Sequence, residues 1–393
     1  MLKAFKSALV QRSIPGTLVP YADVASRIRN CGPMKAHRFT SRGVAQPLLF
    51  HGRLTRCVAP HCSKDNHMDF RSWITPLALI ASVTGSLAGS QAASNLSPPT
   101  TTTGAQPRET SGPLREELAR IAAASKGTVG VAAIDIATGD VTAFNADERF
   151  KMASTFKVPV AVYALRLGEE GRLSLSEPVP VRREDMVAPG ILFDHFRHPG
   201  VAISLLNAME LSVTTSDNGA TDMILQRVGG PAAVQGWLKS RGYSEMNIGS
   251  RTVKETFTPA VAAQPVNAET ASLDRTVTPR EMARFLADLH RGQLIAAQGT
   301  TTILEMMGRT VGDRLALYLP PGTTVRHKTG TLLGGEGVSV NDVGYVTRPN
   351  GAVVVMAVFI KNSPESVAHS TRDKVIGHVA RAIYDDIQLG AAR

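Results

Sequence analysis

Three short motifs in the sequence carry side chains that could catalyse acyl transfer. They are residues 154–157 (STFK), 216–218 (SDN) and 328–331 (KTGT), and they follow one another in this order. If Ser154 begins a helix, Lys157 lies one turn later on the same face, where a neutral amine can take the hydroxyl proton. The positive end of that helix would stabilise an oxyanion formed beside Ser154. Ser154 is therefore a candidate nucleophile.

The other two motifs supply groups that suit the substrate of such a reaction. Ser216 offers a second hydroxyl for a leaving nitrogen, and Asn218 offers an amide that can orient a substrate carbonyl. Lys328, Thr329 and Gly330 come just before a predicted edge strand and offer a cation, a hydroxyl and room for a substrate. Each motif alone is weak evidence, since SDN is also typical of a helix N-cap and KTGT of a strand turn. Their order, with starts 62 and 112 residues apart, is much more specific.

With these residues the sequence resembles the class A serine β-lactamases, within the larger group of penicillin-recognising acyl-serine enzymes. The resemblance covers residues 113–389 and includes STFKVPVA, TTSDNGATDMIL and VNDVGYV. It implies a β-lactamase/transpeptidase-like fold and hydrolysis of a small-molecule β-lactam through an acyl-enzyme on Ser154, which would confer β-lactam resistance. No metal or organic cofactor is implied, because the nucleophile, the proton carriers and the oxyanion donors are all protein groups.

The resemblance also implies roles for single residues. Lys157 would be the proton partner of Ser154, while Ser216 and Lys328 would serve the leaving nitrogen and the substrate carboxylate. The backbone N–H groups of Ser154 and Thr331 would form the oxyanion hole.

Five residues are implied in substrate binding. Asn218 would bind the substrate through its amide, and the hydroxyls of Thr329 and Thr331 would contact the carboxylate beside Gly330. Arg314 lies fourteen residues before the KTGT motif, where a subset of the family carries a carboxylate-binding arginine. An ordinary surface arginine is the alternative for that position.

The sequence departs from the family at the group that hydrolyses the acyl-enzyme. The family uses a Glu between the second and third motifs, usually followed closely by an Asn, and residues 251–279 contain no such pair. Glu255 is the nearest candidate, although it comes late and Pro259 stands in place of the Asn. Glu269 is the second candidate. We predict that Glu255 is the catalytic base, with a solvated loop residue as the alternative.

Two other functions therefore stay open. A D-alanyl-D-alanine peptidase or an esterase would keep the three motifs without efficient deacylation of β-lactams. A penicillin-binding sensor would be acylated and stay so. The deacylating base discriminates among the three.

The hydrophobic pattern predicts an α/β (α+β) fold that can hold these motifs. Terminal helices are predicted at residues 113–124 and 371–387. Two hairpins are predicted, one from residues 128–136 and 141–146 and the other from residues 341–347 and 352–360. The middle, residues 154–310, is mostly helical. We expect one antiparallel sheet built from both chain ends and covered by the terminal helices, a helical lobe, and the site in the cleft between them.

Composition limits the partners of this chain of 393 residues, which has a net charge of +10. Residues 1–67 hold 11 basic and 2 acidic side chains, whereas residues 68–393 hold 32 and 31. The basicity belongs to the leader, which argues against a nucleic-acid partner. All three cysteines also precede residue 68, so the body needs no disulfide.

The N-terminal region predicts export. Residues 68–93 have the short charged start, apolar stretch and small-residue end of a signal peptide. We expect residues 1–67 to be an upstream extension absent from the mature protein, with a long targeting region as the alternative. Residues 94–112 read as a Ser/Thr/Pro-rich linker and residues 113–393 as the catalytic domain. A periplasmic or secreted monomer without a stable membrane span is expected.

Overall fold

The computed structural model describes residues 110, 112–258, 274–334 and 336–391. Every described residue belongs to one compact unit. The predicted upstream extension and signal peptide lie outside the described residues, as does Glu269. Within the predicted linker, Thr110 donates its N–H to Ala143 O at 3.0 Å and accepts from Ala143 N at 2.8 Å, so the folded body includes residue 110.

One antiparallel sheet contains strands from both ends of the described chain, as predicted. Its order is β2-β1-β9-β8-β7, and Val131 of β1 lies opposite Val358 of β9. The strands are β1 (Thr128–Asp135), β2 (Val141–Phe144), β7 (Thr324–Gly334), β8 (Gly337–Thr347) and β9 (Val353–Ser363).

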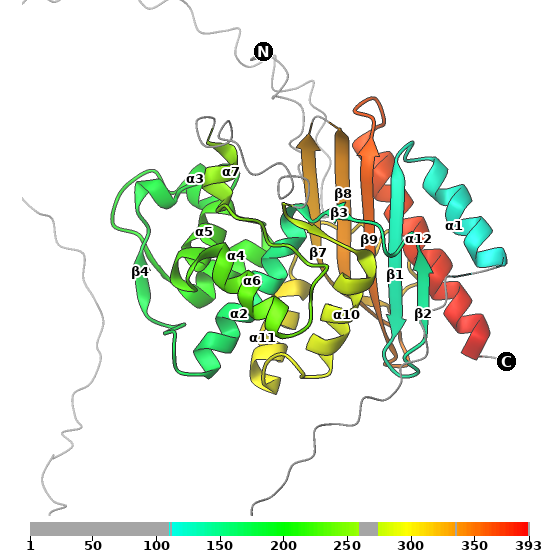
Figure 1. The fold of residues 1–393 in the computed structure, drawn as a ribbon, viewed down its shortest axis with the longest axis horizontal. Coiled ribbons are helices and arrows are strands. Elements are labelled where there is room, and N and C mark those ends of the chain that lie inside the picture. Colours follow the sequence, from blue (N-terminus) through cyan, green and yellow to red (C-terminus); the bar gives the residue numbers. More distant parts are fainter. Residues whose placement is uncertain (1–109, 111, 259–273, 335, 392–393) are drawn as a thin grey trace, which may run out of the picture. The chain divides into compact units, whose positions relative to one another are not determined.

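The two terminal helices cover one face of this sheet (Figure 1). They are α1 (Pro113–Ala123), which begins with a proline in its first turn, and α12 (His369–Ala391). Side chains alternate across a strand, so Val129 and Val131 pack toward these helices whereas Ala132 belongs to the core on the other face. Each face of the sheet therefore has its own apolar core.

The other face packs against a helical lobe, in agreement with the predicted helical middle (Figure 1). Its core is α2, of which ten of 13 residues are buried. The helices are α2 (Lys157–Glu169), α3 (Ile191–His195), α4 (Leu205–Thr214), α5 (Asn218–Arg227), α6 (Gly230–Ser240), α7 (Val253–Phe257), α10 (Pro279–His290) and α11 (Ala297–Gly308). Two short ribbons were not predicted, β3 (Phe150–Lys151) with β6 (Thr276–Val277), and β4 (Pro178–Pro180) with β5 (Ala202–Ser204).

The KTGT motif lies inside the edge strand rather than just before it. Lys328 pairs with Val343 and Thr331 with Val340, in a ladder that runs the whole length of β7 and β8. A Lys-Thr-Gly-Thr segment is typical of a turn by composition, but pairing with the buried strand β8 outweighs that local preference.

Gly130 marks a close approach between β1 and the strand β3 that leads to the predicted nucleophile. A Cβ atom at residue 130 would lie 2.3 Å from the Phe150 ring and 2.9 Å from Pro279 Cγ. We expect Gly130→Ala to lower the free energy of unfolding by about 1–3 kcal/mol, as overpacking of a core does. Chemical denaturation measures this change.

Gly236→Ala is the matched control, because nothing lies within 4 Å of a Cβ there and the residue is exposed in the middle of α6. That variant should be as stable as the parent or slightly more so. Equal stability of the two variants would contradict the assigned packing.

Candidate active site

Ser154 stands where a tight turn runs into the buried helix α2. The 3₁₀ turn Ala153–Phe156 is continued by α2 from Lys157, so Ser154 and Lys157 are one turn apart as predicted. Ala153 has a positive φ of 46°, an uncommon backbone conformation for a residue with a side chain. The Asn341 amide of β8 holds this turn by donating to Lys151 O at 2.8 Å and Met152 O at 2.9 Å.

Gly330 lets the edge strand β7 come close to the nucleophile's backbone. A Cβ at residue 330 would lie 2.9 Å from Met152 O and 3.1 Å from Ser154 N. A larger residue would push β7 away from the Ser154 amide. The glycine of the KTGT motif therefore brings the Ser154 N–H beside β7, which carries Thr331.

Lys157 is buried beneath the SDN segment. Its Nζ lies 2.5 Å from Ser216 O, 2.8 Å from Asn218 Oδ1 and 3.3 Å from Ser216 Oγ. Burial holds the pKa of the Lys157 amine well below its ordinary value, and the charge of Lys328 lowers it further. The structure thus joins two of the three motifs through one amine.

The SDN segment is both a helix cap and part of the site. Asp217 caps α5 by accepting from Ala220 N at 2.7 Å, and it also accepts from Leu192 N at 2.8 Å. Ser216 has a positive φ of 62°. The doubly bound Asp217 stabilises this strained turn, and strain of this kind gathers at functional sites. The cap that the sequence suggested as an alternative is therefore the device that positions Ser216.

Lys328 is fully buried in β7, where its Nζ donates to Thr329 O at 2.8 Å. Burial lowers the pKa of Lys328 to about 7, with Asp342 raising it and Arg314 lowering it. Near neutral pH this amine therefore exists in both protonation states.

Arg314 is buried and holds β7 rather than lying on the surface. Its guanidinium donates to Gly330 O at 3.0 Å, to Asn341 O at 2.9 Å and to Thr331 Oγ1 at 2.8 Å. Asp373 accepts its Nε–H at 2.7 Å. The ordinary surface arginine is therefore the wrong alternative for this position, and its donors are used mainly on the protein itself.

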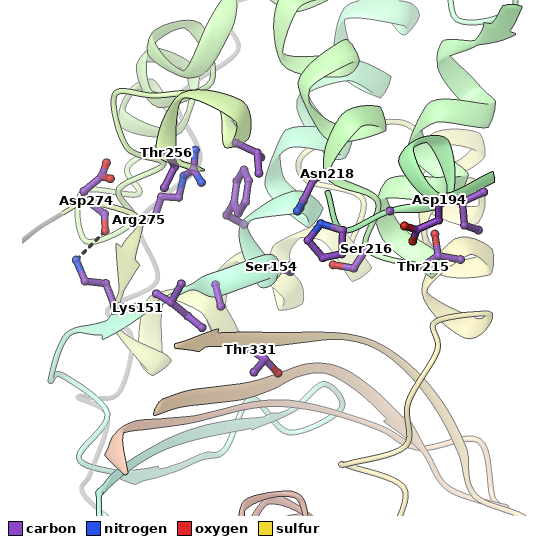
Figure 2. Close-up of a pocket in the computed structure, with 17 residues that line it drawn as sticks. Lys151, Ser154, Asp194, Thr215, Ser216, Asn218, Thr256, Asp274, Arg275 and Thr331 are labelled. Carbon is purple, nitrogen blue, oxygen red and sulfur yellow. Dashed lines mark hydrogen bonds between the residues drawn. The ribbon is translucent and has the colours of Figure 1, made fainter. Parts of the chain in front are cut away.

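A cavity of about 460 Å³ opens over these groups (Figure 2). Ser154, Ser216, Asn218 and Thr331 line it, whereas Lys157 and Lys328 are buried behind its wall and Thr329 is half-buried in β7. The other lining residues come from both lobes: Lys151, Ala153, Phe156, Pro189, Gly190, Ile191, Asp194, Thr215, Val253, Thr256, Asp274, Arg275 and Leu332.

Glu255 is not among the lining residues. Its carboxylate accepts from Thr252 N at 2.7 Å and its N–H donates to Thr252 Oγ1 at 3.3 Å, a capping box at the start of α7. Val253 and Thr256 of the same helix line the cavity, and a helix turns about 100° per residue, so Glu255 lies on another face. The structure does not bring Glu255 to Ser154, and its catalytic role stays a prediction.

Sequence reasoning missed two charged residues, the buried Asp222 and the half-buried Arg275. Asp222 accepts from Val253 N and Lys254 N, both at 2.7 Å, and so fixes α7 against the cavity. Asp222 follows Asn218 by one helical turn on α5, and this spacing in the sequence could have identified it. The Arg275 guanidinium lies 4.5 Å from the centre of the Phe156 ring and donates to Arg251 O. No sequence motif indicated this residue.

The comparisons with known proteins agree with this geometry. A model of the beta-lactamase enzyme family matches residues 113–387. The chain belongs to the beta-lactamase enzyme family. It is 29% identical over 279 residues to the extended-spectrum beta-lactamase PER-1 of Pseudomonas aeruginosa, which covers 69% of this chain and 86% of that protein.

Other members of the family are similar in sequence and structure. Beta-lactamase CTX-M-8 of Citrobacter amalonaticus is 28% identical over 274 residues, covering 69% of this chain and 88% of that protein. The solved structure of an ancestral class A beta-lactamase is 30% identical, with a TM-score of 0.61, covering 70% of this chain and 99% of that one. A beta-lactamase from Chitinophaga pinensis is 26% identical, with a TM-score of 0.62, covering 70% and 100%. The mixed fold with an antiparallel sheet, expected from the sequence, is thereby confirmed.

The pKa of Lys328 leads to a pH-dependent affinity. The ammonium form is present below pH 7 and is lost as pH rises through that value. If Lys328 binds a substrate carboxylate, the dissociation constant of a β-lactam should rise up to about tenfold per pH unit above neutrality. Calorimetry on Ser154→Ala, which has no nucleophile, measures binding alone.

The control for this measurement is Lys328→Arg in the same Ser154→Ala background. A guanidinium stays charged, so its dissociation constant should not change over this range. A parent affinity that is equally independent of pH would show that Lys328 does not bind the carboxylate.

Proposed function

We propose that the protein is a serine hydrolase of β-lactams that works through an acyl-enzyme on Ser154. The single observation that carries the proposal is the Lys157 amine, which contacts Ser216 and Asn218 behind a cavity that Ser154, Ser216 and Asn218 all line. Family membership supports it, since the similar proteins named above are beta-lactamases.

Acylation uses groups that line the cavity or lie directly behind its wall. Neutral Lys157 takes the Ser154 proton as the hydroxyl attacks the lactam carbonyl. The N–H groups of Ser154 and Thr331, at the closely packed turn and strand, bind the oxyanion. Ser216 then donates a proton to the lactam nitrogen as the C–N bond breaks.

Two side chains of the site keep a hydrogen-bond donor for the substrate. Asn218 Oδ1 accepts from Lys157 and its Nδ2 donates to Ala188 O at 3.2 Å, which leaves its second N–H for a substrate carbonyl. Thr331 Oγ1 accepts from Arg314, so its own hydrogen can be donated to the substrate carboxylate. Lys328 and Thr329 complete this end of the site, and Arg314 acts through Thr331 as a positioning residue.

A related acyl-serine hydrolase of peptides or esters is the second candidate function, with a permanently acylated sensor beside it. The observation that favours them is the position of Glu255, whose carboxylate caps α7 outside the cavity. Turnover of a chromogenic cephalosporin separates a β-lactamase from the other two functions, because a sensor or a peptidase would trap one equivalent and stop.

Export and resistance belong to the same proposal. Residues 68–93 would direct the chain to the periplasm or the medium, with Met68 as the true start and residues 1–67 as an upstream segment outside the mature protein. None of the described helices is long and apolar enough to cross a membrane. N-terminal sequencing of the native protein tests the export proposal, since a mature end within residues 1–67 would contradict it.

Ser154→Ala should abolish hydrolysis of a chromogenic cephalosporin, because its hydroxyl forms the covalent bond. Loss of such a nucleophile typically lowers kcat by about 10⁴–10⁶-fold. Intact-protein mass spectrometry should show a β-lactam adduct on the parent and none on the variant.

Ser240→Ala is the matched control, since Ser240 is exposed at the end of α6 and bonds only locally, to Trp237 O at 2.7 Å. It should behave as the parent does. Near-normal turnover by Ser154→Ala would exclude an acyl-serine mechanism.

A further inference from the structure

Residues 312–315, which we call the arginine segment, belong to the connection between α11 and β7 and include Arg314. Leu315 at the end of this segment is fully buried, and its N–H donates to Asp342 Oδ2 of β8 at 3.0 Å. The Arg314 guanidinium reaches β7 from the same segment. Its position therefore depends on a backbone that the Asp342 carboxylate fixes.

The Asp342 carboxylate has a second partner, the imidazole of His327 in β7. His327 Nδ1 lies 2.8 Å from each of the two Asp342 oxygens, and the two residues are only 5% and 0% exposed. A buried carboxylate is costly unless it is paired and hydrogen-bonded. The His327 ring therefore stabilises and orients the carboxylate that accepts from Leu315 N.

The two strands leave just enough room for this pair. His327 lies opposite Gly344, where a Cβ atom would lie 2.8 Å from His327 Cβ. Thr329 lies opposite Asp342, and a Cβ at Gly312 would lie 3.2 Å from Thr329 Cγ2. The arginine segment, the His327–Asp342 pair and the strand of the KTGT motif are therefore packed directly against one another.

The surroundings keep the His327 ring charged. Burial lowers the pKa of His327, but the charge of Asp342 and the hydrogen bond to it raise the pKa more, so that it lies above its ordinary value. Lys328 of the same strand opposes this rise, and the Gly312 backbone supports it. Asp342 can therefore stay ionised and accept from both of its partners.

We propose that His327 is a positioning residue for the binding of a substrate carboxylate. His327 fixes Asp342, Asp342 fixes the arginine segment, and the segment directs the guanidinium of Arg314 to Thr331 Oγ1, 2.8 Å away. The inference rests on the proposed function, in which Thr331 donates its hydroxyl hydrogen to the carboxylate of the substrate. His327 is not among the described residues that line the cavity, so it acts through these groups and does not touch the substrate.

The test compares a β-lactam acid with its methyl ester, two ligands that differ only at the carboxylate. Calorimetry in the Ser154→Ala background, below pH 7 where Lys328 carries its charge, measures both dissociation constants. With His327→Leu or His327→Ala added, the value for the acid should rise about tenfold and that for the ester should change by less than about twofold, as expected when a hydrogen bond to a charged group is weakened. A merely structural role would weaken both ligands alike.

The alanine variant leaves room for a water beside Asp342, so a misfolded leucine variant would not decide the result. His327→Asn keeps an N–H donor near the position of Nδ1, and it should restore most of the affinity for the acid. In an Arg314→Gln background, His327→Ala should cause no further loss, because its effect reaches the ligand through Arg314.

His290→Ala is the matched control. His290 is a half-buried histidine at the end of α10, and its ring lies 5.7 Å from that of Tyr345 in β8. Tyr345 belongs to the core on the helical-lobe face of the sheet, whereas Leu315 belongs to the core on the other face. His290→Ala should therefore keep the parent's preference for the acid over the ester.

His327 variants that keep the parent's preference for the acid, or that weaken the ester as much as the acid, would overturn the inference. A parent that binds acid and ester equally would overturn it too. Intact-protein mass spectrometry of the protein with Ser154 tests the proposed function separately. If no β-lactam adduct forms, that function fails, whereas an adduct together with an unchanged preference in the His327 variants contradicts the inference alone.

Discussion

The buried amine of Lys157 is the group on which the rest of this site depends. A charged ammonium is costly to bury, and Lys157 is only 1% exposed at the start of α2, a helix of which ten of the 13 residues are buried. The amine therefore takes its hydrogen-bond partners from Ser216 and Asn218, two residues of one segment. The same desolvation that makes the amine costly also makes it a base, so packing of the helical lobe and chemistry have a common origin.

The strained turns beside this amine are held by groups that also build the fold. Ala153 and Ser216 both have positive φ angles, and a buried polar side chain makes hydrogen bonds beside each of them. Asn341 of the sheet holds the turn at Ala153, and Asp217 joins the starts of α5 and α3 beside Ser216. Stability and function are therefore difficult to separate in these two turns, because removal of either clamp would relax the backbone that carries a reactive hydroxyl.

A few residues of the edge strand β7 determine its distance from Ser154, its attachment to the fold and the charge beside the cavity. Gly330 gives the clearance that brings the strand against Ser154, while Arg314 ties the strand to α12 through Asp373 and to β8 through Asn341 O. Burial and the opposing charges of Asp342 and Arg314 bring the pKa of Lys328 to about 7. As the edge strand, β7 pairs with β8 on one side only, and its residues Thr331 and Leu332 line the cavity.

The sequence by itself determined much of this protein. Apolar runs on either side of the turn residues 137–140 and 348–351, and the helical periodicity at both ends, predicted the antiparallel sheet and its terminal helices, because turns and helices are encoded by local residues. The three motifs identified Ser154, Lys157, Ser216, Asn218 and Lys328, since chemistry of this kind needs particular side chains at particular spacings. The order of the same motifs also predicted the family to which the chain belongs.

Only the tertiary structure decided how these residues are used. The three partners of Lys157, the clearance at Gly330 and the buried position of Arg314 each join residues that are distant in the chain, and local patterns do not encode such distances. Glu255 shows this most clearly. Its residue type and position made it the candidate base, but the phase of α7 directs Val253 and Thr256 to the cavity and leaves Glu255 to cap the helix. Packing decides which face of a helix points to a cavity, and here Asp222 fixes α7 by accepting from Val253 N and Lys254 N. A single sequence does not show which face of so short a helix will point to the site.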